Sequence, residues 1–408
     1  MIAENRRRIR TPGPVVPAFL RYAQVMKIDG LNFCVIGGGI GGMAAALALR
    51  QSGARVTLLE QAPELTEVGA GLQISANGMA VLRALGVAGA SSKAAQKSHG
   101  TILRDYRRGR VISTVEAPSA GSTYYYHRAD LLDALVKAAV QAGVDIRLNA
   151  RVTNVRKHPS DAEISMHDGT RIRAECVVAA DGARSGIRPV LNGSEAARFT
   201  HQVAWRAIIP WAERSAAPMA NLTMAPGRHV VTYPLRDQSL MNIVAIEERS
   251  DWTEEGWRLE GDVVDLRARF ADFGGVTGDI LARIEKVNIW ALFLRPVAQK
   301  WQNGRVALLG DAAHPTLPFM AQGACLALED AWILKRCFDE QSGVKRALEA
   351  YEAARQVRAR RVVAAAAANA RNFHLQGPAR IAAQAALWLV GRRLAQRYNW
   401  VYDFDPTA

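Results

Sequence analysis

Residues 32–60 read NFCVIGGGIGGMAAALALRQSGARVTLLE, and this stretch decides the fold. Phe33 to Ile36 is a short apolar run typical of a buried parallel strand, and Met43 to Arg50 is rich in Ala and Leu, which favours a helix. Arg55 to Leu59 is apolar and β-branched again and predicts a second strand. The order is therefore strand, glycine turn, helix, strand, for which a right-handed crossover is expected.

The glycine turn has the spacing of a dinucleotide site. Gly37, Gly39 and Gly42 lack side chains, so the backbone can turn tightly and a pyrophosphate can approach the N-terminus of the helix. Glu60 ends the second strand about 20 residues later, where its carboxylate can accept both ribose hydroxyls of an adenosine. The acid argues against a 2′-phosphate, but it does not distinguish a flavin from a nicotinamide nucleotide.

The remaining chain continues this α/β pattern and then changes. Residues 199–294 contain alternating or β-branched segments, such as 229–233 and 241–246, which predict a mostly antiparallel sheet inserted into the first domain. Outside this insertion we expect helices at 80–85, 130–142 and 362–370, with helical structure continuing to 400. We also expect a strand-like segment at 101–126 and one strand each at 144–155, 174–179 and 306–309.

Composition places the chain among globular proteins. It has 408 residues, 49% of them hydrophobic and 22% charged, which predicts a large folded body of more than one part. The net charge is +14, and we interpret it as solvated helix faces that attract anionic small molecules. No nucleic-acid motif accompanies it. The arginines of one such face are Arg355, Arg358, Arg360 and Arg361.

The four cysteines have no spacing typical of a metal or redox site, so they are expected to be buried and reduced, and no metal is expected. They are Cys34, Cys176, Cys325 and Cys337.

The two ends of the chain carry unusual segments. Residues 1–26 form a basic arm without an export signal, interpreted as disordered or as an upstream start before Met26, with a cationic targeting role as the alternative. No apolar run reaches the length of about 18 residues that a membrane helix needs. Ile381 to Val390 is too short, and an amphipathic or buried helix is expected there; contact with a membrane surface stays open.

Two later motifs resemble those of FAD-dependent aromatic-ring hydroxylases, the single-component flavoprotein monooxygenases of the salicylate and hydroxybenzoate hydroxylase kind. Residues 181–188 (DGARSGIR) resemble the family's Asp-Gly motif, and residues 310–315 (GDAAHP) resemble its second FAD motif, whose Asp holds the ribityl chain. Residues 67–77, 127–131 and 320–325 resemble shorter segments beside the flavin, and Tyr351, Glu352 and Arg355 fall in the family's late helix. The resemblance covers roughly everything after Met26.

The resemblance implies a set of cofactor-binding residues. The backbone amides of Gly323 and Ala324, at a helix start, are expected to stabilise negative charge on the reduced flavin. For Asp181 and Asp311 the alternative role is that of a turn-forming residue. The full expected set is Gly37, Gly39, Ile40, Gly42, Glu60, Gly71, Arg128, Val152, Asp181, Asp311, Gly323 and Ala324.

The substrate side follows from one predicted strand. Alternation puts His229, Val231 and Tyr233 on one face. In the hydroxybenzoate branch of the family, a His and a Tyr at this spacing face the ring, where the His assists deprotonation of the phenol and the Tyr orients it. A phenolate is more electron-rich than a phenol, so a base near neutral pKa favours electrophilic attack. We therefore expect His229 and Tyr233 to be catalytic; the alternative is a core His and Tyr that bond each other.

Two departures from the family bear on the substrate. Pro318 and Phe319 stand where some hydroxybenzoate hydroxylases have a polar residue, and Gln73 stands where hydroxynicotinate enzymes have a His. No single named substrate can therefore be transferred from the family. Arg206 and Arg236 are candidates for binding a substrate carboxylate, although an Arg is more often structural.

The expected fold is α/β: a Rossmann-like FAD-binding domain with an inserted, mostly antiparallel β-sheet substrate domain and a helical C-terminus. The expected parts are a basic arm at 1–26, the FAD-binding domain at 27–198 with part of the substrate sheet near 98–126, the substrate sheet at 199–294, a return of the FAD-binding domain at 295–340, and a helical region at 341–408.

The resemblance implies a cytoplasmic monooxygenase, a monomer or homodimer, with bound FAD and with NADH or NADPH as transient co-substrate. It would hydroxylate a small phenolic acid of the salicylate, hydroxybenzoate or hydroxynicotinate type with O2, through a flavin C4a-hydroperoxide, in aromatic compound catabolism. One alternative is an epoxidase or quinone-ring hydroxylase of the same superfamily, acting on a lipid at a membrane surface. Another is a basic binding protein that keeps the fold without turnover.

Overall fold

The computed structural model describes residues 28–65, 70–88, 94–117, 123–251 and 259–408. The basic arm with Met26, and residues 67–69 of the loop expected beside the flavin, lie outside this range.

A five-stranded parallel sheet contains the glycine-turn unit, in the strand order β19-β12-β1-β2-β8. Its central strands are buried and apolar because helices cover them, among them α1 (Ile40–Gln51), α4 (Arg128–Gln141) and α8 (Gly323–Glu340). All four cysteines lie in this region, buried and unpaired as expected. The strands are β1 (Asn32–Ile36), β2 (Arg55–Leu59), β8 (Asp145–Arg147), β12 (Cys176–Ala179) and β19 (Val306–Leu308).

The single strand expected at 144–155 is wrong. The chain turns at Asn149, whose φ of 55° is left-handed, so the segment is divided between two sheets. The first part is β8, and the second is β9 (Val152–Lys157), which pairs with β10 (Ala162–Met166), followed by β11 (Arg171–Ala174), in a separate antiparallel sheet. Apolar content alone did not reveal the break, because both halves are β-branched.

An eight-stranded sheet forms the second large layer, and it is antiparallel except for the pairing of β5 with β14. Two of its strands, β5 and β6, come from the segment before α4. A small third sheet joins β3 (Gly71–Ile74), β4 (Gln96–Lys97) and β7 (Tyr124–His127). The strands of the large sheet are β5 (Gly100–Asp105), β6 (Val111–Glu116), β13 (Arg198–Pro210), β14 (Ala220–Ala225), β15 (Arg228–Leu235), β16 (Leu240–Glu248), β17 (Leu259–Gly261) and β18 (Val287–Leu294).

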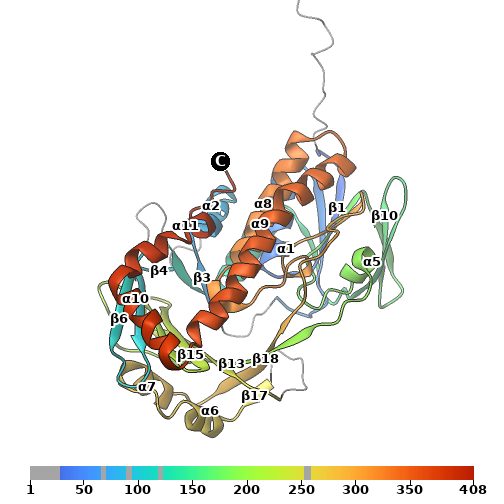
Figure 1. Cartoon of the computed structure of the whole chain (residues 1–408). Helices are drawn as coiled ribbons and strands as arrows, with labels where there is room; N and C mark the ends of the chain where they lie inside the picture. The colour runs from blue at the N-terminus through green and yellow to red at the C-terminus, as the bar shows by residue number, and fades with distance from the viewer. Residues whose placement is uncertain (1–27, 66–69, 89–93, 118–122, 252–258) are drawn as a thin grey trace, which may run out of the picture.

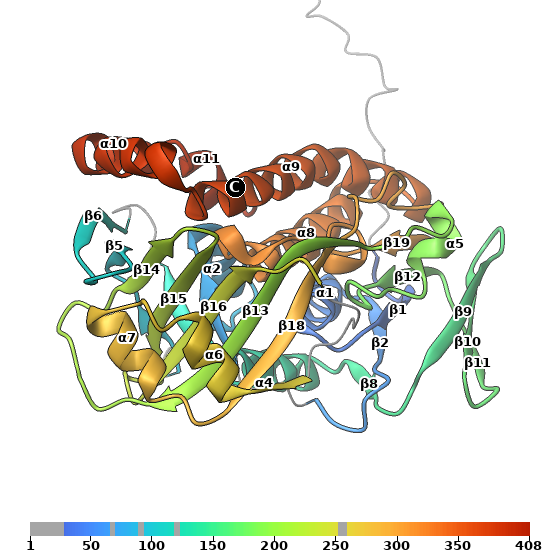
Figure 2. The same ribbon diagram turned by 60° about the horizontal axis from the view of Figure 1, so that its bottom comes forward.

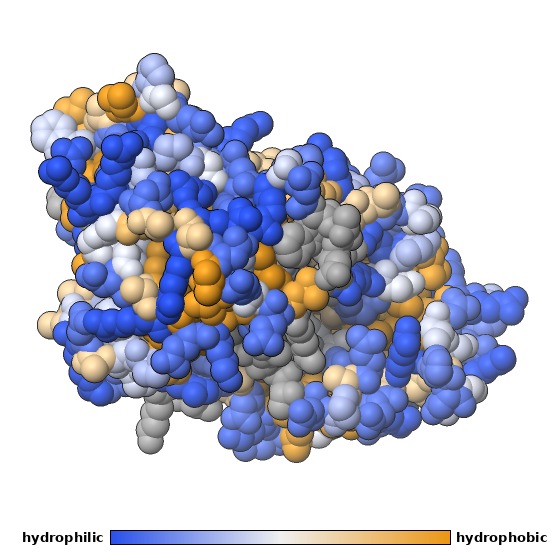
Figure 3. Space-filling model, turned by 90° about the horizontal axis from the view of Figure 1, so that it is seen from below, coloured by the Kyte–Doolittle hydropathy of each residue, from blue (hydrophilic) through white to orange (hydrophobic). Residues whose placement is uncertain are grey.

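The two faces of this sheet have different partners. On one face α6 (Val263–Arg269) and α7 (Gly275–Ala282) pack against residues such as Trp205 and Val230 in a separate core (Figure 2). The sequence predicted strands and loops here, and neither helix was predicted because both are short. The outer surface at this end is largely hydrophilic, broken by small apolar areas (Figure 3). The opposite face of the sheet is left for the cavity described below.

The C-terminal part is helical, as expected, with α9 (Val344–Phe373), α10 (Gly377–Gln396) and α11 (Asn399–Tyr402) after α8 (Figure 1). Helix α10 packs against β6 and is not buried, since Ile381 and Trp388 are 70% and 73% exposed. Within the described residues, none of the helices combines the length and apolar character that crossing a bilayer requires.

The solvated face expected for the arginines of α9 is wrong for two of them. Arg355 is only 1% exposed, and its guanidinium pairs with Asp330 and Glu329 of α8 at 2.6 Å each. Arg358 pairs with Glu329 at 2.7 Å. These charges are buried because α9 crosses α8 there, and their carboxylate partners come from a helix that sequence spacing does not relate to α9.

This ion network also holds the second FAD motif in shape. Asp330 accepts hydrogen bonds from the backbone N–H of Gly310 at 3.0 Å and from His314 Nε2 at 2.5 Å. Burial alone would raise the pKa of Asp330, but the charges of His314 and Arg355 outweigh it and lower the pKa to about 2. Asp330 is therefore ionised at neutral pH, and its hydrogen bonds hold the turn that carries Asp311.

Candidate functional site

A cavity of about 1140 Å³ runs from the carboxyl ends of the parallel strands to the free face of the eight-stranded sheet. Its lining includes Gly39, Asp311 and Gly323 at one end and Leu222 and His229 at the other. A volume above the usual range of about 300–1,000 Å³ for one small ligand can hold a dinucleotide and a small ring together.

The glycine turn is built for close backbone contact. A Cβ on Gly37 would lie 2.4 Å from the carbonyl oxygen of Ala180, and one on Gly42 would lie 2.0 Å from that of Gly37. Gly37 also has a φ of 103°, which side chains rarely adopt. At Gly39, by contrast, an added Cβ meets nothing within 4 Å. The residue lines the cavity as the N-cap of α1, so the backbone there is open to an anion.

Gly42→Ala is expected to weaken FAD binding by about ten- to a hundred-fold, because displacing the backbone at this contact costs ~1–3 kcal/mol. The absorbance of bound flavin in the purified protein, titrated with FAD, measures the loss. Gln51→Ala is the control, because Gln51 is exposed at the end of the same helix and does not line the cavity. Equal FAD affinity in the Gly42 variant and the control would contradict the role of this turn.

Two acids expected to contact the cofactor accept hydrogen bonds from the backbone. Glu60 accepts the N–H of Gly38 at 2.6 Å and that of Ala62 at 2.8 Å. Asp181 accepts the N–H of Gly186 at 2.9 Å, which is the turn-forming role, and its other oxygen is buried without a hydrogen-bond partner. Neither residue lines the cavity. At the Asp-Gly motif the lining is formed by Ala180, Gly182, Ala183 and Arg184.

Asp311 faces the cavity directly. Burial raises the pKa of its carboxyl, while the charges of His314 and Arg128 oppose that shift. Among the described residues no side chain or amide hydrogen-bonds this carboxylate, so its acceptor oxygens suit hydroxyl groups such as those of a ribityl chain. Gly323 and Ala324 begin α8 beside it and line the same space, so the residues present fit a flavin nucleotide.

Of the remaining residues expected to bind the cofactor, three line the cavity and one does not. Ile40, Gly71 and Arg128 line the cavity. Val152 does not line the cavity; it begins β9, which belongs to the separate three-stranded antiparallel sheet.

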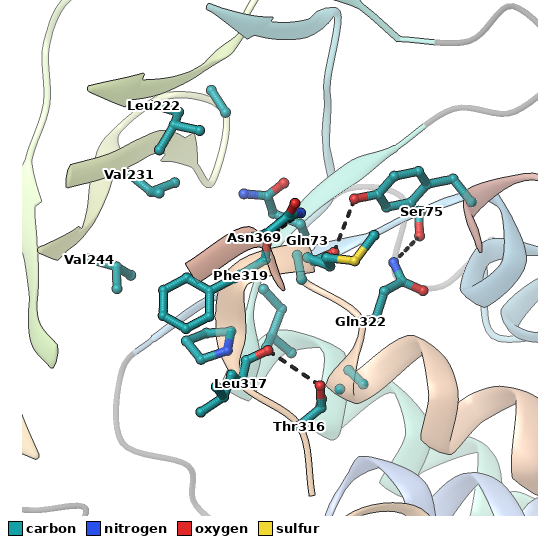
Figure 4. Close-up of a pocket in the computed structure, with 18 of the residues that line it drawn as sticks. Gln73, Ser75, Leu222, Val231, Val244, Thr316, Leu317, Phe319, Gln322 and Asn369 are labelled. Carbon is teal, nitrogen blue, oxygen red and sulfur yellow. Dashed lines mark hydrogen bonds between the residues drawn. The ribbon is translucent and has the colours of Figure 1, made fainter. Parts of the chain in front are cut away.

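His229, Val231 and Tyr233 all line the cavity, so the alternation expected for β15 is confirmed. Along the strand the first and last are about 13 Å apart, with Val231 between them. Figure 4 shows Val231 with Leu222 and Val244 on the sheet, facing Phe319 across the cavity.

The two polar residues of this face are buried, and burial shifts the pKa of each. Burial, and then the neighbouring His374, holds the pKa of His229 well below its usual value, so the ring is a neutral base. Burial raises the pKa of Tyr233, which keeps its hydroxyl protonated. Tyr233 packs against Tyr125, with ring centroids 4.9 Å apart. His229 and Tyr233 do not bond each other, which removes that alternative.

Of the two candidate arginines, only Arg206 is at the cavity, where its guanidinium lies 4.1 Å from the ring centroid of Trp290. Its charge also acts on Tyr233. Arg236 instead forms a two-pronged ion pair with Asp130 at 2.7 and 2.9 Å, outside the cavity lining. The sequence could not show which of the two arginines lies at the cavity, because both follow apolar strand residues.

Two residues behind His229 were not predicted from the sequence. His374 ends α9 and Glu248 ends β16, and both join His229 in one hydrogen-bonded chain. His229 and His374 are 145 positions apart in the sequence, and His374 and Glu248 are 126 positions apart. Neither His374 nor Glu248 belongs to a motif, so no local pattern relates them to His229.

Known proteins resemble this chain over most of its length. A family model described as FAD binding domain matches residues 31–366. The 3-amino-4-hydroxybenzoate 2-monooxygenase of Streptomyces platensis is 32% identical over 388 residues, which covers 92% of this chain and 96% of that protein. The 3-hydroxybenzoate 6-hydroxylase of Polaromonas naphthalenivorans is 31% identical over 389 residues, with the same coverage. A solved salicylate hydroxylase substrate complex superposes with a TM-score of 0.79 at 26% identity, covering 93% and 96% of the two chains.

Proposed function

The chain belongs to the FAD-binding-domain family of flavin monooxygenases, and from this premise we propose that it hydroxylates a small phenolic aromatic acid, with NADH or NADPH and O2 as co-substrates. The supporting observation is the position of His229, a buried neutral imidazole on the cavity wall beyond the flavin-binding end. The named relatives act on aminohydroxybenzoate and hydroxybenzoate, which favours a small aromatic acid over a membrane lipid.

The residues support an orientation for such a substrate. A ring lying over Val231 would be within reach of His229 at one end and of Tyr233 and Arg206 at the other. His229 would accept the phenol proton, Tyr233 would donate a hydrogen bond, and Arg206 would offer a cation to the carboxylate. Bound FAD supplies the activation of oxygen. The apolar wall of Leu222, Phe319 and their neighbours would exclude water from the ring.

The pH dependence should reflect the lowered pKa of His229. A base must be neutral to accept a proton, and a lowered pKa keeps the imidazole neutral to lower pH. The hydroxylation rate at saturating substrate should therefore stay constant as pH falls from 7.5 to 6 and decrease only in more acidic buffer. Product formation at a series of pH values measures this; a half-maximal rate near pH 6.5, the ordinary value for His, would contradict it.

A substrate screen tests the proposal as a whole. Oxygen consumption with NADH and with NADPH is measured in the presence of salicylate, 3-hydroxybenzoate, 3-amino-4-hydroxybenzoate or 6-hydroxynicotinate, and the products are identified. We expect at least one of these acids to stimulate oxygen uptake and to gain one hydroxyl group. If none is hydroxylated while an isoprenoid quinone or another lipid is, the aromatic-acid proposal is wrong.

A further inference from the structure

Three side chains form a continuous hydrogen-bonded chain from the cavity to the protein surface. His229 Nδ1 lies 2.7 Å from His374 Nε2, and His374 Nδ1 lies 3.0 Å from Glu248 Oε1. The three residues come from β15, the end of α9 and the end of β16.

The burial of this chain is graded. His229 is 1% exposed and lines the cavity, the His374 side chain is 1% exposed, and the Glu248 side chain is 49% exposed. The rings of Phe373 and Phe319 lie 5.3 and 5.5 Å from that of His229 and cover its sides. The row of hydrogen bonds from His229 to Glu248 therefore connects the cavity with the solvent, and apolar side chains surround it at His229.

Glu248 is placed to exchange a proton. Its neighbour Glu247 points to the other face of the strand and is held by Arg249 and Arg269. Within the part of the chain that the structure describes, the only ion pair of Glu248 is with His374. A carboxylate without an Arg or Lys partner, half open to water, can take up and release a proton.

The carboxylate of Glu248 determines which nitrogen donates in each hydrogen bond from Glu248 to His229. A carboxylate only accepts, so His374 must donate from Nδ1. Burial lowers the pKa of His374, although Glu248 opposes this, and a neutral His374 must then accept at Nε2. His229 therefore donates from Nδ1 and keeps Nε2 free of a proton. Nε2 is the nitrogen that remains for a substrate in the cavity, and in this form it is a base.

We propose that His374 and Glu248 form a proton relay that fixes His229 as the base for the phenol and delivers the phenol's proton to solvent. The proposal rests on the proposed function. His229 Nε2 takes the phenol proton as the phenolate forms, its Nδ1 proton passes to His374 Nε2, and the His374 Nδ1 proton passes to Glu248, which releases it to water. Each imidazole gains one proton and loses one, and no electrons are transferred.

The tautomer gives a test that does not need turnover. In FAD-loaded protein labelled with ¹⁵N-histidine, the nitrogen shifts of His229 should show a protonated Nδ1 and an unprotonated Nε2. The spectrum of His229→Gln identifies the signals. In Glu248→Ala the preference should weaken, giving a mixture of both neutral tautomers. A wild-type His229 with its proton on Nε2 would overturn the relay.

Kinetics test the transfer itself, with 3-hydroxybenzoate or whichever acid the screen identifies. His374→Gln keeps a donor and an acceptor but cannot pass a proton on, and Glu248→Ala removes the outlet. Both should lower kcat by about tenfold, as removal of a partner that orients a histidine does, with KM and FAD content within twofold of wild type. Added formate should restore Glu248→Ala, because the position is open to solvent.

Glu260→Ala is the matched control, an exposed acid on β17 of the same sheet. Wild-type kcat in both relay variants would overturn the proposal, as would a loss in Glu248→Ala that formate does not restore. The formate result decides the matter even if the His374 variant fails to fold. If wild-type protein hydroxylates no phenol, the proposed function fails, while the tautomer measurement still reports on the relay.

Discussion

His229→Ala should lower the rate of ring hydroxylation by about 10²- to 10⁴-fold, the usual contribution of a positioned general base. The physical reason is that the lining beside His229 is apolar, with Leu222, Val231 and Phe319, and Tyr233 keeps its proton because burial raises its pKa. FAD should stay bound, because His229 lies on the sheet and away from the glycine turn. Product formation under saturating NADH and substrate measures the loss.

The controls separate chemistry from folding. His167→Ala changes an exposed histidine in a turn and should leave the rate unaltered. His229→Gln keeps a hydrogen-bonding side chain without a comparable base and should be nearly as slow as the Ala variant. Hydroxylation at the original rate in His229→Ala would show that another group deprotonates the phenol, and the catalytic assignment would be withdrawn.

Arg355→Ala should reduce the free energy of unfolding by about 3 to 5 kcal/mol, because it removes the guanidinium that Asp330 and Glu329 share and leaves the buried Glu329 with Arg358 as its remaining cation. Asp330 and Glu329 are both fully buried and both pair with Arg355 at 2.6 Å. FAD affinity should fall as well, since Asp330 holds the turn from Gly310 to His314 that positions Asp311. Urea denaturation of the FAD-loaded protein, with flavin release followed in parallel, measures both effects.

Arg360→Ala is the control on the same helix, an exposed arginine five positions later, and should change the unfolding free energy by no more than about 0.5 kcal/mol. A loss below about 1 kcal/mol in Arg355→Ala would mean that the buried network contributes little and that the carboxylates find other partners.

The glycine-turn unit could be predicted because its constraints are local. Strand, turn and helix follow one another within 30 residues, and the small residues needed at Gly37 and Gly42 appear directly in the sequence. The face of β15 was predictable for the same reason, since alternation along one strand places His229 and Tyr233 together. The two helices α6 and α7 were missed because a short helix leaves too few periods to recognise.

Which charged side chains are buried, and which partners they contact, could not be predicted from the sequence. Arg355 and Arg360 look alike on the helix, yet one is buried against α8 and the other is solvated. Arg206 and Arg236 also look alike, and only the packing of β13 beside Trp290 brings the first to the cavity.

The sequence by itself determined the α/β fold class, the dinucleotide-type glycine turn and the strand that carries the expected base. The tertiary structure alone decided what stands behind that base, because hydrogen bonds between His229, His374 and Glu248 join segments more than 100 residues apart. Local propensity acts along the chain over a few residues, whereas burial and the pairing of charges depend on which surfaces meet after folding.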